Sequence, residues 1–279
     1  MKYQPYSLHA GQLPVKRDLT LVFMLSLVSA ILMGGVSLGG LLYPTAFYPT
    51  DELFQSFAPN DVVNLFVGLP ILLGSTWLTR RGELVGLLLW PGALLYVLYN
   101  YIPYILGTPF GLFTFAYLAL VLLSTSSILD LLKSIDKKSV QEQLSGGVPV
   151  RTAGWVLVGF GVLFTFRAIG MIAEASTNQT MLPISELSVF ADIAISIVWI
   201  VGGVLLLRRS PLGYVSGLGL LFVGSMLFVG LIMFLLLQPV LTDAPFSLVD
   251  IVVVFIMGLV CFVPFGLFVR GVASTEKQS

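Results

Sequence analysis

Charged residues, histidine and cysteine are all scarce in this sequence. Charged residues make up 10% of the 279 positions, whereas a soluble globular domain carries roughly 25%. Histidine and cysteine each occur once, as His9 and Cys261. A haem with an axial histidine, a copper site, a histidine-based zinc site and an iron–sulfur cluster all need more ligands of these types. The composition therefore predicts no cofactor and no metal, and it excludes a disulfide between two cysteines of this chain.

Hydrophobic residues, in contrast, make up 57% of the chain and lie in long runs. Eight runs reach the roughly 20 residues that a helix needs to cross a bilayer. None shows the alternation of a membrane β-strand, and a helix satisfies its own backbone hydrogen bonds in lipid. The runs are 19–42, 61–78, 83–105, 110–132, 152–174, 187–207, 213–237 and 248–269. The sequence predicts an all-α integral membrane protein, an eight-span helical bundle in a lipid bilayer.

The basic residues indicate an orientation for these spans. If all eight runs cross the membrane, every basic residue except Arg167 falls on one side, together with both termini. The basic residues on that side are Lys2, Lys16, Arg17, Arg80, Arg81, Lys133, Lys137, Lys138, Arg151, Arg208, Arg209, Arg270 and Lys277. Because lysine and arginine collect on the cytoplasmic side, we expect a protein of the cell membrane with both termini cytoplasmic. The opposite loops are acidic, with Asp51, Glu52, Glu186 and Asp243.

A polar segment divides the spans into two groups of four. Residues 133–151 are charged and then rich in glycine, which is typical of a linker. We therefore expect an N-terminal half at 1–132 and a C-terminal half at 152–279. Each half has a double arginine between its second and third spans, and sixteen residues before it lies Asn64 in one half and Asp192 in the other. These matches fit a parallel repeat, as in some transporters, or chance, since apolar helices joined by basic turns resemble one another.

Arg167 is the one basic residue inside an apolar run. It lies seven residues before Glu174, near the outer end of the fifth run, or roughly 10 Å below that end. A charge at this depth costs about 3 kcal/mol to insert. Its side chain could extend to the interface or be bridged to Glu174. Asp192 is the preferred partner, because it lies at a similar depth in the next run and a carboxylate can satisfy a guanidinium.

Other polar residues fall at a similar depth and predict a polar layer. Asn100 lies in the third run among several tyrosines, and an amide in hydrocarbon needs a hydrogen-bonding partner. The predicted substrate-binding residues are Arg167, Asp192, Glu174, Asn100, Asn64 and Tyr96. Such a layer is either a satisfied structural network or the floor of an outward-facing binding site. We favour a binding site, because ionisable groups inside a membrane are often functional.

Several polar residues near helix starts have a structural interpretation. Asp61 follows a proline and is expected to cap or begin the second span. Ser185 is expected to cap the sixth span. Ser247 and Asp250 have the spacing of a capping box at the start of the last span. These residues are therefore assigned to helix capping and not to a binding site.

One glycine-rich motif resembles a catalytic motif by chance. Residues 35–39 read GVSLG, the pattern of a serine hydrolase, but that chemistry needs a strand–turn–helix context and a histidine base. In an apolar run, Gly35 and Gly39 instead have the spacing of a close helix–helix contact. The pairs 82–86 and 213–217 share that spacing and that interpretation.

Three classes of function fit the sequence. The first is transport or binding of a small anionic or zwitterionic solute, with Arg167 as the recognising charge and Asp192 as its support. The second is a non-catalytic sensor or assembly partner of other membrane subunits, in which this pair only fixes helix register. The third is an enzyme that modifies lipid from the outer leaflet, which would need a metal or an acid–base pair. Transport ranks first, and the balanced charge, with 14 basic and 14 acidic residues, gives no sign of a nucleic-acid partner.

Overall fold

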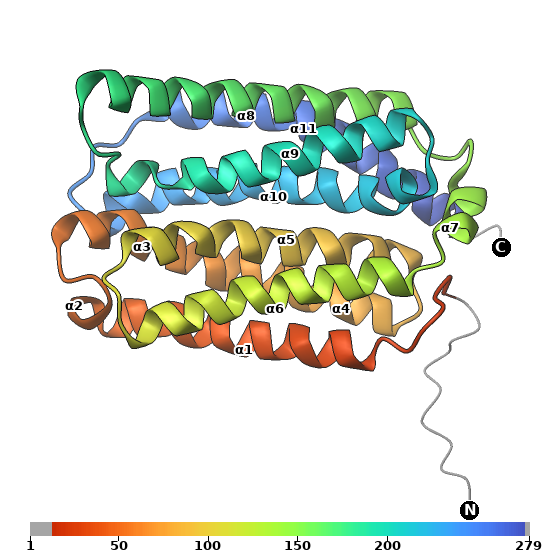
Figure 1. Cartoon of the computed structure of the whole chain (residues 1–279), viewed down its shortest axis with the longest axis horizontal. Coiled ribbons are helices and arrows are strands. Elements are labelled where there is room, and N and C mark those ends of the chain that lie inside the picture. Colours follow the sequence, from red (N-terminus) through yellow and green to blue (C-terminus); the bar gives the residue numbers. More distant parts are fainter. Residues whose placement is uncertain (1–12, 277–279) are drawn as a thin grey trace, which may run out of the picture.

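The computed structural model describes residues 13–276, which are almost entirely helical and contain no β-sheet (Figure 1). The elements are α1 (Thr20–Leu42), α2 (Pro44–Phe47), α3 (Asp51–Val63), a π-helical turn η1 (Asn64–Gly68), α4 (Leu69–Arg80), α5 (Leu84–Gly107), α6 (Leu112–Ser134), α7 (Lys137–Leu144), α8 (Val150–Asn178), a 3-10 turn η2 (Ile184–Glu186), α9 (Ser188–Leu207), α10 (Pro211–Leu241) and α11 (Leu248–Glu276). Eight helices in this range are long and apolar enough to cross a membrane. They support a multi-pass membrane protein in a lipid bilayer. His9 lies outside the described residues.

The second of these helices begins earlier than the sequence predicts. It runs from Asp51 to Arg80 as α3, η1 and α4 together, whereas the apolar run starts at residue 61. The Thr50 side chain caps it by accepting a hydrogen bond from the N–H of Leu53 (3.3 Å), and acidic residues in the first turn suit the helix dipole. The start of this helix therefore lies in a polar stretch that hydropathy alone does not identify as helical. Pro59 lies inside the helix and does not begin it.

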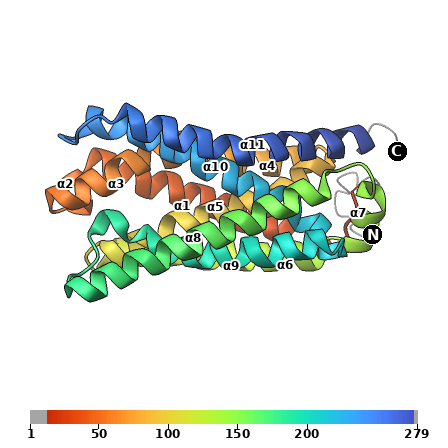
Figure 2. The ribbon, with the colours of Figure 1, turned by 90° about the horizontal axis from the view of Figure 1, so that it is seen from above.

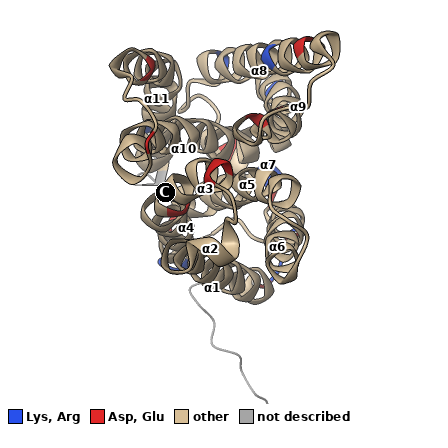
Figure 3. Ribbon diagram, turned by 90° about the vertical axis from the view of Figure 1, so that its left-hand side faces the viewer, with Lys and Arg blue, Asp and Glu red and all other residues tan. Residues whose placement is uncertain are grey.

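Both double-arginine segments form tight turns, as the sequence predicts. Residues 81–83 connect α4 to α5, and residues 208–210 connect α9 to α10. Each turn places one residue in the left-handed region, Gly82 with φ of 83° and Arg209 with φ of 52°. We name the end of the bundle that carries these two turns the basic end. The opposite end, which carries Asp51, Glu52, Glu186 and Asp243, is the acidic end, and Figure 3 looks onto it.

The spans before residue 135 lie together on one side of the molecule and those after residue 150 on the other (Figure 1). α5 and α10 cross where the two groups meet, at Gly92 and Gly219. A Cβ atom on Gly92 would lie 2.2 Å from the carbonyl oxygen of Gly219, so the two backbones touch directly. α5 is the most enclosed span, with 72% of its apolar window buried, against 22% for α8 and α11. The exposed apolar faces of α8 and α11 are those that lipid would cover.

The segment between the two groups is a docked helix and not an extended linker. Asp136 caps α7: its carboxylate accepts from the N–H of Lys138 (3.2 Å) and lies 3.4 Å from Lys16 Nζ. Desolvation acts to raise the pKa of Asp136, but the N–H of Ser139 and the charge of Lys16 outweigh it and hold that pKa below its ordinary value. A β-bridge joins Val15 to Ile135, the residue after α6, and the Gln141 side chain donates to the backbone oxygen of Arg209 in the α9–α10 turn. Both groups of spans are thus tied to α7 at the basic end.

Candidate functional site

The ion pair that the sequence predicts is present between α8 and α9. The Arg167 guanidinium donates a hydrogen bond to Oδ2 of Asp192, and Tyr99 Oη on α5 donates to Oδ1 at 2.7 Å. The Asp192 side chain is 1% exposed, whereas that of Arg167 is 49% exposed. The carboxylate is therefore buried and accepts two hydrogen bonds, whereas this contact uses one of the five N–H donors of the guanidinium.

This pair lines a cavity of about 670 Å³ that six helices enclose. α3, α5 and α9 contribute most of its polar lining, and α8, α10 and α11 most of its apolar lining. α8 and α11 approach each other toward the basic end and diverge toward the acidic end (Figure 2). Because residues of both helices line the cavity, it lies between the diverging parts of the spans. The size is in the range of small-molecule sites, roughly 300–1,000 Å³.

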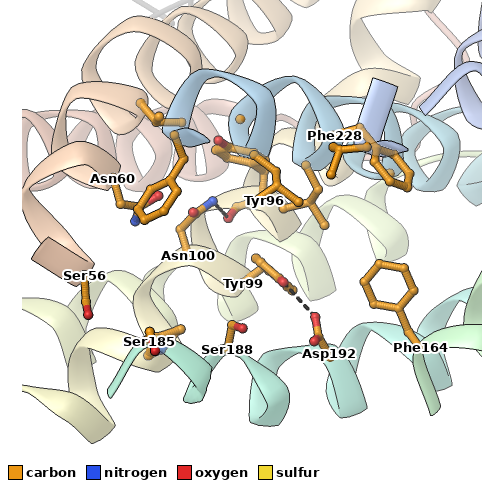
Figure 4. A pocket seen from close by; sticks show the side chains of 18 of the residues that line it. Ser56, Asn60, Tyr96, Tyr99, Asn100, Phe164, Ser185, Ser188, Asp192 and Phe228 are labelled. Carbon is orange, nitrogen blue, oxygen red and sulfur yellow. Dashed lines mark hydrogen bonds between the residues drawn. The ribbon is translucent and has the colours of Figure 1, made fainter. Parts of the chain in front are cut away.

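The polar and apolar linings occupy different parts of the cavity. Figure 4 shows hydroxyl and amide side chains gathered at one end and the rings of Phe164 and Phe228 at the other, with Asp192 and Tyr99 between them. The hydroxyl and amide residues that line it are Ser56, Asn60, Asn100, Ser185, Ser188 and Gln238. The main apolar residues are Leu163, Phe164, Trp199, Leu227, Phe228, Leu231, Phe234, Val254 and Met257. The cavity therefore offers hydrogen bonds and a charge to one part of a ligand and an aromatic surface to the rest.

Four of the six predicted site residues line this cavity. They are Arg167, Asp192, Asn100 and Tyr96. Asn100 Nδ2 donates to the backbone oxygen of Tyr96 at 2.9 Å, one helical turn earlier (Figure 4). This bond uses one N–H of the amide and leaves its oxygen free to accept a hydrogen bond. Tyr99 also lines the cavity and supports Asp192. The sequence did not indicate this contact, because four tyrosines between residues 96 and 104 are typical of an interfacial belt.

Glu174 and Asn64 do not line the cavity. Glu174 is exposed two turns beyond Arg167 on α8, roughly 10 Å further along the helix axis. Asn64 is fully buried at the start of η1, and neither atom of its amide has a hydrogen-bond partner in the described structure. The predicted layer therefore separates into a cavity wall, an exposed carboxylate and a buried amide.

Asp61 has a different position from the predicted one. It is fully buried inside α3, because the helix already begins at residue 51, and it caps nothing. Its carboxylate accepts hydrogen bonds from Tyr48 Oη at Oδ2 and from Tyr104 Oη at Oδ1, the latter at 2.9 Å. Asn60 Nδ2 donates to the same Tyr104 oxygen at 3.3 Å. A second buried acidic centre thus lies behind the cavity wall, with Asn60 between the two.

The other expected caps have mixed outcomes. Ser185 lies within η2 and lines the cavity, whereas α9 begins at Ser188 without a side-chain cap. The capping interpretation of Ser185 is therefore wrong, because the short 3-10 turn precedes the helix. Ser247 does accept a hydrogen bond from the N–H of Asp250 at 3.3 Å, which is one half of the predicted capping box.

Comparison with protein-family models, curated proteins and solved structures gave no match for this chain. Among residues 13–276, no group of three or more histidine, cysteine, aspartate or glutamate side chains is arranged to hold a metal ion. Function must therefore be argued from the geometry of the cavity and its charges.

Proposed function

We propose that this chain is an eight-span membrane protein that binds a small anionic or zwitterionic solute in the cavity and carries it across the membrane. The observation that carries the proposal is the state of Arg167, whose guanidinium is anchored by a buried carboxylate while half of its side chain stays exposed. An arginine that served only to neutralise Asp192 could be enclosed completely. This one presents free N–H donors beside a cavity of ligand size.

The support behind Arg167 favours recognition of an anion. Asp192 and Tyr99 hold the guanidinium in one orientation, so a bound carboxylate or phosphate would meet a preorganised pair of donors. Asp192 balances the charge of Arg167, so the pair is neutral overall. An incoming anion would bind the exposed N–H groups of Arg167 and leave the hydrogen bond to Asp192 in place. A zwitterion could in addition place its ammonium group near the hydroxyl and amide oxygens at the polar end, such as Ser188 and Asn100.

A panel of small anions and zwitterions tests whether Arg167 recognises the ligand. Purified protein is mixed with small carboxylates, phosphates, sulfonates and amino acids, and thermal unfolding is followed. A true ligand at about a hundred times its Kd should add about 2.7 kcal/mol to the free energy of unfolding. The double variant Arg167→Gln/Asp192→Asn keeps a neutral hydrogen-bonded pair and should lose this stabilisation.

The matched control is Arg151→Gln, which makes the same change at an exposed position near the start of α8. It should keep the full response to the ligand. Equal stabilisation of the double variant and wild type would overturn the role of Arg167. A panel with no stabilising member would favour the second class of function, a scaffold or sensor, for which the exposed apolar faces of α8 and α11 offer a surface to another membrane subunit.

Orientation in the membrane is part of the proposal and has its own test. We place the basic end and both termini in the cytoplasm, with two halves at 1–132 and 152–279 joined by the segment 133–151. In a Cys261→Ser background, a cysteine at Thr180 should react with an impermeant maleimide on intact cells, because that loop lies at the acidic end. A cysteine at Ser145 should react only after the cells are opened, and the reverse pattern would invert the topology.

A further inference from the structure

The carboxyl group of Asp61 is buried without a positively charged partner. Within residues 13–276, the two ion pairs are Lys16–Asp136 and Arg167–Asp192, and no basic nitrogen lies within 4.0 Å of Asp61. An isolated carboxylate in an apolar interior carries a large desolvation cost, so such groups are normally paired or neutralised by a proton. Hydrogen bonds from Tyr48 and Tyr104 reduce that cost but supply no charge.

The groups that face Asp61 are phenols and a hydroxyl. Tyr48 approaches from the segment after α2, Tyr101 and Tyr104 from α5, and Tyr117 from α6. α1 contributes Ser37, whose Oγ lies 3.3 Å from Tyr101 Oη. A phenol ionises only near pH 10, so none of these groups changes charge near neutral pH. Asp61 is thus the one carboxyl group among these side chains and the one that would exchange a proton.

We propose that Asp61 is a proton-binding site that can take up and release a proton and is linked to the cavity through Tyr104 and Asn60. The site contains acceptors for both protonation states. With Asp61 ionised, Tyr104 donates to Oδ1 at 2.9 Å. When a proton adds to Oδ1, the new O–H donates back to Tyr104 Oη, and the Tyr104 hydrogen turns to the backbone oxygen of Phe57, which lies 3.3 Å away. No hydrogen bond is lost in this rearrangement.

The space around the carboxyl group favours a proton over a metal cation. A Cβ atom on Gly40 would lie 2.2 Å from Asp61 Oδ2 and 2.6 Å from Tyr48 Oη, so the backbone of α1 closes directly over the group. Both carboxyl oxygens are already occupied by phenol O–H donors. A sodium ion would need several oxygen ligands in their place, whereas a proton needs only a turn of existing hydroxyl groups.

The contact between Asn60 and Tyr104 predicts how ligand binding in the cavity affects protonation of Asp61. Asn60 lines the cavity and donates to Tyr104 Oη at 3.3 Å. A ligand anion that accepts the Asn60 N–H removes that donor, and Tyr104 Oη becomes a better acceptor for a protonated Asp61. Ligand and proton should therefore bind together, and by reciprocity each should strengthen the other. This coupling rests on the proposed function, whereas the proton site itself does not.

Infrared spectroscopy of the purified protein without ligand tests the proton site. A protonated carboxyl group gives its own C=O band, and the band of Asp61 should be present near pH 5 and fade by about pH 9. Asp61→Asn should remove this band, and its amide oxygen can still accept from one of the two phenols while its NH2 group donates to the other. Tyr104→Phe should enlarge the band at a fixed pH near neutrality, because the hydrogen bond lost is stronger for the ionised form.

Asp250→Asn is the matched control, since Asp250 is exposed in the first turn of α11 and should leave the band unchanged. If wild type lacked the band at pH 5, Asp61 would be ionised and the proposal would fail. A band that is constant at every pH would make Asp61 a fixed structural donor, which also overturns proton exchange. Loss of the band on addition of sodium at constant pH would indicate a cation site instead. Because none of the carboxylates, phosphates, sulfonates or amino acids of the ligand panel is added, all of these outcomes are independent of that panel.

Discussion

Replacement of Arg167 by leucine is expected to lower the free energy of unfolding by about 3 kcal/mol, the low end of the cost of removing one partner of a buried pair. The reason is the asymmetry of the pair: Asp192 is 1% exposed and would lose its counter-charge in an apolar interior, so it must stay ionised at a cost or take up a proton, while Arg167 is 49% exposed and partly solvated. The hydrogen bond from Tyr99 remains and limits the loss. Thermal or denaturant unfolding in lipid or detergent measures the change.

A second variant separates the charge effect from the loss of packing. Arg167→Leu/Asp192→Asn removes both charges and leaves the Tyr99 bond with an amide acceptor, so it should be more stable than Arg167→Leu alone. If the single variant lost less than about 0.5 kcal/mol, the value of a typical exposed pair, the pair would not be buried in the way described. Unfolding of Arg167→Gln/Asp192→Asn in the same series shows whether the variant used for ligand binding is folded.

Replacement of Gly92 by alanine is expected to have a comparable effect for a steric reason. The added methyl group would lie 2.2 Å from the carbonyl oxygen of Gly219, and both partners are backbone, so no side chain can move aside. α5 and α10 would have to separate, at a cost of about 3 kcal/mol or more for overpacking of this kind. Unfolding measurements should show this loss, and cavity binding should weaken because both helices line it.

Gly35→Ala is the control for that change. A Cβ atom at Gly35 would have no other atom within 4 Å, although the same residue type lies in the same kind of apolar helix. Because alanine is the better helix former, this variant should be neutral or more stable by up to about 1 kcal/mol. Equal losses at both positions would show that the α5–α10 contact has no special role.

The helices and the ion pair could be predicted from the sequence because their causes are local. Span length and hydropathy are properties of a continuous segment, and they gave the eight helices and both tight arginine turns. The pairing of Arg167 with Asp192 could be predicted because consecutive helices run antiparallel. Residues at the same depth in the two helices then lie beside each other. The start of the second span was missed, since a threonine cap in a polar stretch outweighs the hydropathy signal.

The features that failed depend on contacts between distant segments. Asp61 was assigned to a helix start, but its environment comes from tyrosines on α5, α6 and the segment after α2. The spacing of Gly35 and Gly39 predicted a helix contact, yet Gly35 is open and the closest crossing joins Gly92 to Gly219. Glycine spacing within one helix cannot identify a crossing that needs one glycine from each of two helices. The positions of Asn64 and Glu174 likewise depend on the rotation of each helix, which hydropathy does not determine.

The attachments around α7 lie at one end of the molecule, so we expect any relative motion of the two groups of helices to be smallest there. The bridge at Val15 and the hydrogen bond from Gln141 to the α9–α10 turn restrain the spans at the basic end. The cavity lies where α8 and α11 have already separated. Any rocking of one group of spans against the other would thus use the basic end as its fulcrum. A helix of 20 residues is a lever of about 30 Å, so a tilt of about 10° moves its far end by about 5 Å.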